Sequence, residues 1–496
     1  MASDTLNRHT PSLQGKLMGG IVWMLLLNLL VKPFWILGIE VGVQNAVGSE
    51  TYGFYFAVFN LSYIFNILLD IGLTNFNTRN IARHPQLVDK HLPAILAAKL
   101  LLLGLYVAVT FTAGLLLGYG SRQFRLLALL CVNQFLNSLL LYLRSNFEGL
   151  MLFRWDSVLS VMDRVLMIVI CGALLWLPGH PAFKIEYFVY AQTAAYVATA
   201  AVALAVLLGR LRRLGHPARL RRTAFRAWSP LTRVILRKSL PFALLVLLMA
   251  SYNRLDPVLL GRLASDGARQ AGIYACAFRL LDALTMIAYL VSVPLLPVFA
   301  RQTRHSPAEV PATTRTVFSL MMVFAVAAAV TLASMSESLM ALLYDSHADE
   351  SAAVFRVLIY GIIPLSATYV FGTLLTANGN LRQLNILAAV TLAINIAVNI
   401  VCIPRFGAVG SAWASLTAQT FIAVAQIAVA VKLFDMRPSA GYIVRLLLFA
   451  TLLVVGNMLA AGIAWWLQII LSAAAALLLA VLLKLAQPKE IIASLK

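Results

Sequence analysis

The stretch Ser239–Leu263, SLPFALLVLLMASYNRLDPVLLGRL, decides how the rest of the sequence is interpreted. It is long and apolar enough to cross a bilayer, which takes about 20 helical residues. Arg254, Asp256 and Pro257 nevertheless lie well inside it. An ionised side chain at membrane depth costs at least ~2.5 kcal/mol on insertion scales, so two in one span are expected to face a polar interior. The stretch therefore predicts a membrane helix that lines a charged internal surface.

The composition extends this prediction to the whole chain. Of its 496 residues, 61% are hydrophobic and 12% charged, and a soluble domain with that balance would expose too much apolar surface. We therefore predict an all-α polytopic membrane protein. The net charge of +20 is explained by basic cytoplasmic loops, so we expect no nucleic-acid partner. The four cysteines lie in apolar segments and fit neither a disulfide framework nor a zinc site.

Fourteen apolar runs are long enough to be membrane spans. They are residues 17–43, 52–76, 92–118, 124–147, 155–177, 183–208, 239–263, 271–299, 316–336, 352–378, 382–404, 408–432, 442–463 and 465–486. With the N-terminus placed in the cytoplasm, the inner segments hold 27 Lys and Arg residues and the outer loops six. Cytoplasmic loops collect basic residues, so both termini are predicted to be cytoplasmic.

A weak internal repeat divides the chain. The motif Gly53-Phe-Tyr55 in the second span is matched by Gly272-Ile-Tyr274 in the eighth, 219 residues later. The same offset places Lys32 within three residues of Arg254. The repeat predicts two pseudo-symmetric six-helix lobes related by an axis along the membrane normal, followed by two more helices. The expected domains are an N-terminal lobe at 1–208, a basic cytoplasmic linker at 209–238, a second lobe at 239–432, and the last two helices with the tail at 433–496.

The predicted linker carries nine Arg, one Lys and no acid between Arg210 and Lys238. One interpretation is that it lies against anionic lipid headgroups, which is worth about 1 kcal/mol per basic residue near the surface. The other is that it first docks an anionic lipid substrate. We favour the first, because cytoplasmic loops are commonly basic.

Charged side chains inside the predicted spans differ in depth and pairing. Four lie near span ends, where they can reach the headgroups: Lys99, Arg356, Glu40 and Asp70. Among the deeper charges, Arg279 and Asp282 are three residues apart on one helix face and are expected to neutralise each other. Arg254 and Asp256 are two apart and point to nearly opposite sides. Each of these two therefore needs a partner on another helix, in water or in a ligand.

The deep charges allow two interpretations. One is a buried ion-pair network that fixes helix packing. The other, which we favour, is a cationic cavity for a phosphate or diphosphate, to which Arg presents a bidentate fork. The residues expected to bind the diphosphate are Arg254, Lys32, Arg164 and Arg279. The residues expected to act as coupling groups or charge-pair switches are Asp256, Asp70, Asp163 and Asp282.

Motifs for other chemistries are not found in the sequence. It has no Gly-rich loop ending in Gly-Lys-Ser/Thr and no clustered metal ligands, so we expect no cofactor, while a coupling cation, H⁺ or Na⁺, stays open. Membrane polymerases and ligases of glycans need a large outer loop with catalytic groups. The longest outer loop here, 336–351, is short and acidic, so we do not expect an enzyme.

A series of short motifs carries a family resemblance. They are Tyr52-Gly53-Phe-Tyr55 and Asp70-Ile-Gly72-Leu in the second span, Arg254-Leu-Asp256 with Gly261 in the seventh, Ala271-Gly272-Ile-Tyr274 leading to Ala277-Phe278-Arg279, and the pair Pro294/Pro297 before Ala300-Arg301. In this order and spacing they resemble the polysaccharide flippase family of the multidrug/oligosaccharidyl-lipid/polysaccharide exporter superfamily. The resemblance covers the whole chain.

The resemblance implies a protein of the bacterial inner membrane that flips a polyprenyl-diphosphate-linked oligosaccharide outward by alternating access. It implies as partners this glycolipid, membrane lipids, and a polysaccharide polymerase with other export proteins. The alternatives are a cation-coupled multidrug or metabolite antiporter of the same superfamily and a lipid II flippase. Cation-rich deep charges disfavour the antiporter. The segment Val47-Gly-Ser-Glu50-Thr-Tyr52-Gly53 stands in place of the Asp-Ala-Phe and Pro-rich signature of lipid II flippases.

Overall fold

The computed structural model describes residues 30–84, 86, 88–177, 182–213, 230–436, 439–460 and 462–485, which are helical wherever they form regular secondary structure. The predicted all-α class is therefore confirmed. Two compact units share the chain: unit 1 comprises residues 1–46 and 65–243, and unit 2 comprises 47–64 and 244–496. The division into two lobes, a linker and two final helices stays a prediction. Much of span 17–43 and of linker 209–238 lies outside the described residues.

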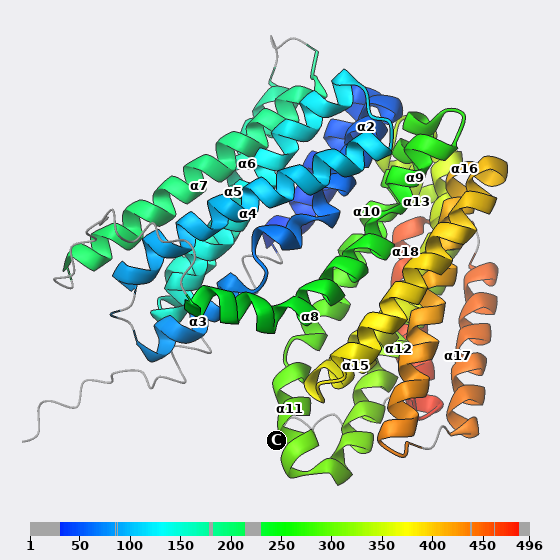
Figure 1. The fold of residues 1–496 in the computed structure, drawn as a ribbon. Helices are drawn as coiled ribbons and strands as arrows, with labels where there is room; N and C mark the ends of the chain where they lie inside the picture. The colour runs from blue at the N-terminus through cyan, green and yellow to red at the C-terminus, as the bar shows by residue number, and fades with distance from the viewer. Residues whose placement is uncertain are drawn as a thin grey trace, which may run out of the picture. The chain divides into compact units, whose positions relative to one another are not determined.

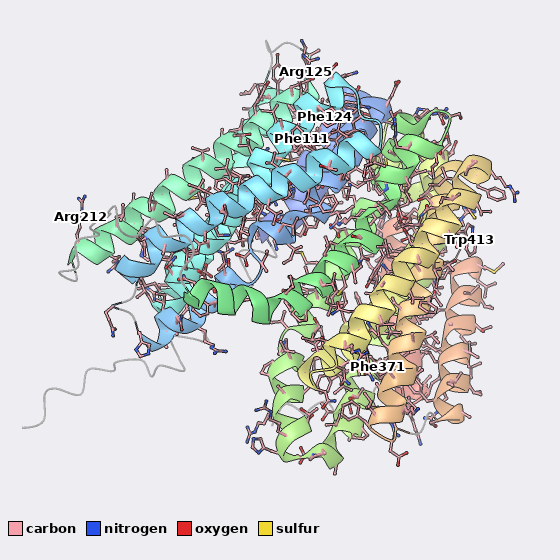
Figure 2. The ribbon with its side chains drawn as sticks, in the orientation of Figure 1. Phe111, Phe124, Arg125, Arg212, Phe371 and Trp413 are labelled. Carbon is pink, nitrogen blue, oxygen red and sulfur yellow. The ribbon has the colours of Figure 1, made fainter. Side chains whose placement is uncertain are left out.

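Unit 1 is built from long helices. Its elements are the π-helical turn η1 (Trp35–Glu40), the start of α2 (Val41–Ile64), the 3-10 turn η2 (Asn66–Leu69), α3 (Leu73–Arg83), α4 (Val88–Leu116), α5 (Ser121–Gly149), α6 (Phe153–Trp176), α7 (Ile185–Arg213) and the start of α8 (Pro230–Arg254). α5 packs against α3, α6 and α7 (Figure 1). Figure 2 shows Arg125 and Arg212 at opposite ends of this bundle. Beside Arg125, the rings of Phe111 and Phe124 stack at 5.5 Å and join α4 to α5.

Unit 2 contains the remaining helices. They are the rest of α2 and α8, then α9 (Asp256–Leu263), α10 (Gly267–Ser292), α11 (Leu295–His305), η5 (Pro307–Glu309), α12 (Val310–Ser334), α13 (Ser336–Leu343), α14 (Ala348–Leu358), η6 (Ile359–Gly361), α15 (Ile362–Ala377), α16 (Leu381–Leu433), α17 (Ala440–Leu459) and α18 (Trp465–Leu482). α15 packs along α12 and α16, and α17 packs on α12 and α18 (Figure 1). Phe371 of α15 is buried against Phe318 of α12, whereas Trp413 of α16 is exposed (Figure 2).

Ten described helices are long and apolar enough to cross a membrane, or eleven if the bent pair α8–α9 counts as one span. The polytopic prediction is confirmed, and the count of fourteen stays a prediction. Helix α16 runs through both predicted spans 382–404 and 408–432 as 53 residues. It breaks at Gly407, whose φ of 55° is in the left-handed region that glycine adopts at low cost.

The predicted span 52–76 is interrupted. α2 ends at Ile64 and α3 begins only at Leu73. Ile71 and Gly72 between them have positive φ values of 42° and 83°. The backbone therefore leaves helical geometry in the middle of an apolar segment, and its freed carbonyl groups need other partners.

The bend in Ser239–Leu263 follows from its sequence. α8 ends at Arg254, and α9 begins at Asp256 with an angle of 47° between the two helices. Pro257 occupies the first turn of α9, where its missing N–H is tolerated. A proline inside a continuous helix would lose one hydrogen bond and clash with the preceding turn. The bend places Arg254 and Asp256 on different helices.

The repeated motifs meet each other within unit 2. A Cβ atom added to Gly53 of α2 would lie 1.9 Å from the carbonyl oxygen of Ala268, and one added to Gly272 of α10 would lie 1.9 Å from that of Ser49. Ser49 and Ala268, like Gly53 and Gly272, are 219 residues apart. The two helices therefore cross with a local two-fold symmetry that follows the predicted repeat. Only glycine allows backbones to approach this closely.

Candidate functional site

The expected cations Lys32 and Arg164 lie near each other in unit 1. Lys32 interacts electrostatically with Arg164, Asp163 and Arg144. The Nε atom of Arg164 is 3.5 Å from Oδ2 of Asp163. Its guanidinium also lies over the ring of Trp35, 5.1 Å from the centroid, in a cation–π contact. Three predicted site residues are thus brought together by α6 and the segment before α2.

A further ion pair of unit 1 was not expected from the sequence. Arg144 of α5 binds Asp156 of α6 with both Nε and Nη2, at 2.7 and 3.2 Å. This fork geometry is the strongest that an arginine and a carboxylate form. Arg144 therefore has a fixed partner and also interacts with Lys32.

Asp70 is paired with Lys99 at the interruption of the second span. The Nζ atom of Lys99 lies 3.1 Å from Oδ1 of Asp70 and also donates to the carbonyl of Leu69 and the hydroxyl of Ser138. The expectation that Lys99 reaches the headgroups is wrong, because its side chain is 1% exposed. The physical reason is the broken helix, whose freed Leu69 carbonyl and adjacent carboxylate attract a buried cation.

Arg254 stands at the bend between α8 and α9 in unit 2. Its Nη2 atom is 3.1 Å from Oδ1 of Asp282 on α10. Its guanidinium lies over the rings of Tyr63 and Phe278, at 5.0 and 4.9 Å from their centroids. The Arg254 side chain is 19% exposed and that of Asp282 is 50% exposed. The aromatic rings therefore hold a guanidinium whose ionic partner is accessible.

Asp256 is enclosed by neutral donors. Its carboxylate accepts hydrogen bonds from the hydroxyl of Tyr274 at 2.9 Å and from the amides of Asn395 and Asn399 at 3.0 and 2.8 Å. Asp256 is fully buried. Ser411, beyond the break at Gly407, donates to Asn399. The charge of Asp256 is thus balanced, among the described residues, by amide and hydroxyl dipoles.

The prediction that Arg279 and Asp282 neutralise each other is wrong. Asp282 pairs with Arg254, and the Nη1 atom of Arg279 donates to the hydroxyl of Tyr344 at 2.7 Å. The guanidinium of Arg279 also lies 5.0 Å from the ring centroid of Tyr52. Burial raises the pKa of Tyr344, so its phenol stays neutral beside Arg279. The bend at Arg254 brings a second arginine to Asp282, which spacing along one helix could not predict.

The sequence predicted that Arg254 and Asp256 each need a partner on another helix, in water or in a ligand, and the structure places partners on other helices. The sequence analysis missed Tyr63 beside Arg254, and Asn395 and Asn399 beside Asp256. A usable signal existed for the asparagines, because they stand four apart in the apolar run 382–404 and so share one helix face. For Tyr63 we find no such signal.

Residues 17–303 match the family described as polysaccharide biosynthesis protein. The match covers more than half of the chain. The chain belongs to this family. The family resemblance seen in the sequence motifs is therefore confirmed. No curated protein matches this chain.

Several solved structures share the fold of this chain. The lipid II flippase MurJ in an inward closed conformation superposes with a TM-score of 0.69 at 12% identity, covering 92% of this chain and 98% of that one. A multidrug resistance MATE family transporter of the MOP superfamily gives 0.58 at 15% identity, with coverages of 81% and 94%. A MOP superfamily transporter from Pyrococcus furiosus gives 0.59 at 14%, with 85% and 95%. At such identities the likeness shows the fold alone.

Proposed function

We propose that the chain is a flippase of the bacterial inner membrane that moves a polyprenyl-diphosphate-linked oligosaccharide from the inner to the outer leaflet by alternating access. Its family and its likeness to transporters of the MOP superfamily support this proposal. In the proposal the chain is no enzyme and both termini are cytoplasmic. The glycolipid, surrounded by membrane lipids, passes to a polysaccharide polymerase and other export proteins at the outer face.

The observation that best supports the proposal is the environment of Arg254. The ion pair with Asp282 is partly exposed, so it contributes little free energy and can be exchanged. A diphosphate offers paired oxygens that match the guanidinium fork and carries more charge than one carboxylate. Tyr63 and Phe278 keep the guanidinium in place during that exchange. Lys32, Arg164 and Arg279 stay proposed as further diphosphate-binding residues.

Asp256 is proposed to couple transport to H⁺ or Na⁺. Asp256 is a buried carboxylate that accepts N–H and O–H donors, so it can take up a proton, whereas Na⁺ would require the Asn395 and Asn399 amides to turn their oxygens toward it. The Oδ1 atom of Asn395 is also buried without a hydrogen-bond partner among the described residues. Asp70, Asp163 and Asp282 are proposed as switches that pair with nearby cations when no substrate is bound.

The leaflet distribution of polyprenyl-linked oligosaccharides tests the proposal. Deletion of the gene is expected to trap them in the inner leaflet, and the wild-type gene to release them. Arg254→Ala should fail to restore flipping at normal protein abundance. Arg356→Ala is the matched control, since Arg356 pairs with the exposed Glu337 near a predicted span end. Normal flipping by Arg254→Ala would refute the role of Arg254.

A cation-coupled antiporter of drugs or metabolites is the second candidate. The half-exposed Asp282 favours it, because an accessible carboxylate attracts cationic compounds. Unchanged glycolipid distribution after deletion, together with altered sensitivity to cationic drugs, would support the antiporter. Accumulation of lipid II alone would instead identify a lipid II flippase.

A further inference from the structure

Asp282 and Tyr289 of α10 are exposed although they lie within a predicted membrane span. Asp282 and Tyr289 are seven residues apart and Thr285 lies between them, so the three share a face. The Asp282 side chain is 50% exposed and Tyr289 is 52% exposed. Asp282 lies about 16 Å from the start of span 271–299 at ~1.5 Å per residue. A carboxylate at that depth borders water or polar groups rather than lipid, so α10 faces a polar space at Asp282.

Tyrosine rings surround the same face. Tyr289 meets Tyr369 of α15 edge-on, with 6.1 Å between the ring centroids. Tyr369 interacts electrostatically with Asp282, Arg254 and Tyr63. Tyr63 is 37% exposed beside the guanidinium of Arg254. Three helices of unit 2, namely α2, α10 and α15, therefore bring aromatic rings and one carboxylate toward the arginine on α8.

Apart from Arg254, these groups do not attract a phosphate, because Asp282 carries charge of the same sign and the phenol rings carry none. The tyrosine rings are also more than the ion pair between Arg254 and Asp282 needs. A sugar ring matches it: the C–H groups of a pyranose form an apolar face that packs on an aromatic ring, and its hydroxyl groups donate to a carboxylate and to phenol oxygens. Ligand sites commonly combine apolar walls with a few such polar groups.

We propose that Tyr63, Tyr289 and Asp282 bind a sugar ring of the glycolipid next to the diphosphate held by Arg254. This inference rests on the proposed flippase function and specifies how its glycan is recognised. The ring packs against Tyr289, its hydroxyl groups reach Asp282, and the linked diphosphate displaces that carboxylate from Arg254. The site thereby distinguishes a polyprenyl diphosphate that carries a glycan from one that does not.

Native mass spectrometry of the full-length protein, purified from its own membranes, tests this inference. It measures the ratio of bound glycan-carrying to glycan-free polyprenyl diphosphate. Tyr289→Ala is expected to lower this ratio about five- to tenfold, the loss of one aromatic contact, while Tyr289→Phe keeps it. Tyr190→Ala is the matched control, because Tyr190 of α7 is equally exposed at 52%. Arg254→Ala should reduce both lipids together.

The outcomes distinguish failure of the sugar site from failure of the flippase proposal. An unchanged ratio in Tyr289→Ala and in Asp282→Asn, with Arg254→Ala still reducing both lipids, would overturn the sugar site and leave the flippase proposal standing. Wild-type protein that retains no polyprenyl diphosphate of either kind would overturn the flippase proposal and the sugar site with it. If Tyr190→Ala lowered the ratio as much as Tyr289→Ala does, the effect would not be local, and the inference would be overturned.

Discussion

Arg254 of α8 and Asp282 of α10 form an ion pair with 3.1 Å between Nη2 and Oδ1, while Asp256, two residues after Arg254, is buried among neutral donors. The bend at Pro257 separates these neighbouring charges into two environments. Arg254 has a half-exposed ionic partner, Asp282, which a ligand can replace under the proposed function. Asp256 is enclosed and fixed by hydrogen bonds. Under the proposed function, one broken helix therefore serves substrate binding through Arg254 and ion coupling through Asp256.

Replacing Arg254 by lysine tests whether charge alone is sufficient. Arg254→Lys keeps the positive charge but loses the planar fork and the contact with the rings of Tyr63 and Phe278. We expect the flipping rate to fall about tenfold at unchanged protein abundance, which corresponds to ~1.4 kcal/mol. The leaflet assay measures it. A wild-type rate for Arg254→Lys would show that the guanidinium geometry plays no part.

Two substitutions of Asp256 separate stability from coupling. Asp256→Ala leaves the donors of Tyr274, Asn395 and Asn399 without an acceptor, and each buried unsatisfied group costs about 1–3 kcal/mol. We expect its apparent unfolding midpoint in detergent to fall clearly. Asp256→Asn keeps the size and one acceptor oxygen, so it should fold but lose the dependence of transport on an imposed H⁺ or Na⁺ gradient. Gradient dependence that persists in Asp256→Asn would remove Asp256 from coupling.

Much of this molecule was predictable, because a bilayer imposes strict rules on sequence. Continuous apolar runs predict membrane helices, whereas Pro257 lies inside the seventh span without a bend being predicted there. The spacing of Arg254 and Asp256 predicts that they face different partners. The offset of 219 residues identified Gly53 and Gly272 as equivalent, and the structure places these two glycines in contact.

The partners of the charges could not be predicted, because they depend on where helices break. Arg279 and Asp282 suit each other by spacing along α10, yet the bend brings Arg254 closer to Asp282. Lys99 seemed near enough to a span end to reach water, but the interruption of the second span offers it Asp70 and the Leu69 carbonyl. The pattern of apolar residues in the sequence does not show where these two spans are interrupted.

Lys99 provides a test of that interruption. Lys99→Met removes the cation that satisfies Asp70 and the Leu69 carbonyl, and breaking a buried ion pair costs about 3–5 kcal/mol. We expect a marked loss of folded protein. The double variant Lys99→Met/Asp70→Asn should recover part of that loss, because no uncompensated charge remains. If the double variant were no more stable than the single one, the pair would not be what stabilises the broken segment.

The crossing of α2 and α10 gives the last prediction. A Cβ atom at Gly272 would lie 1.9 Å from the Ser49 carbonyl oxygen, a distance that only movement of the backbones can relieve. Gly272→Ala, and likewise Gly53→Ala, should therefore destabilise the protein by about 1–3 kcal/mol, seen as a lower unfolding midpoint in detergent. Gly104→Ala in α4 is the control, because a Cβ atom there meets nothing within 4 Å and alanine favours a helix. Equal midpoints for all three variants would show that the two repeated helices are not held at this close approach.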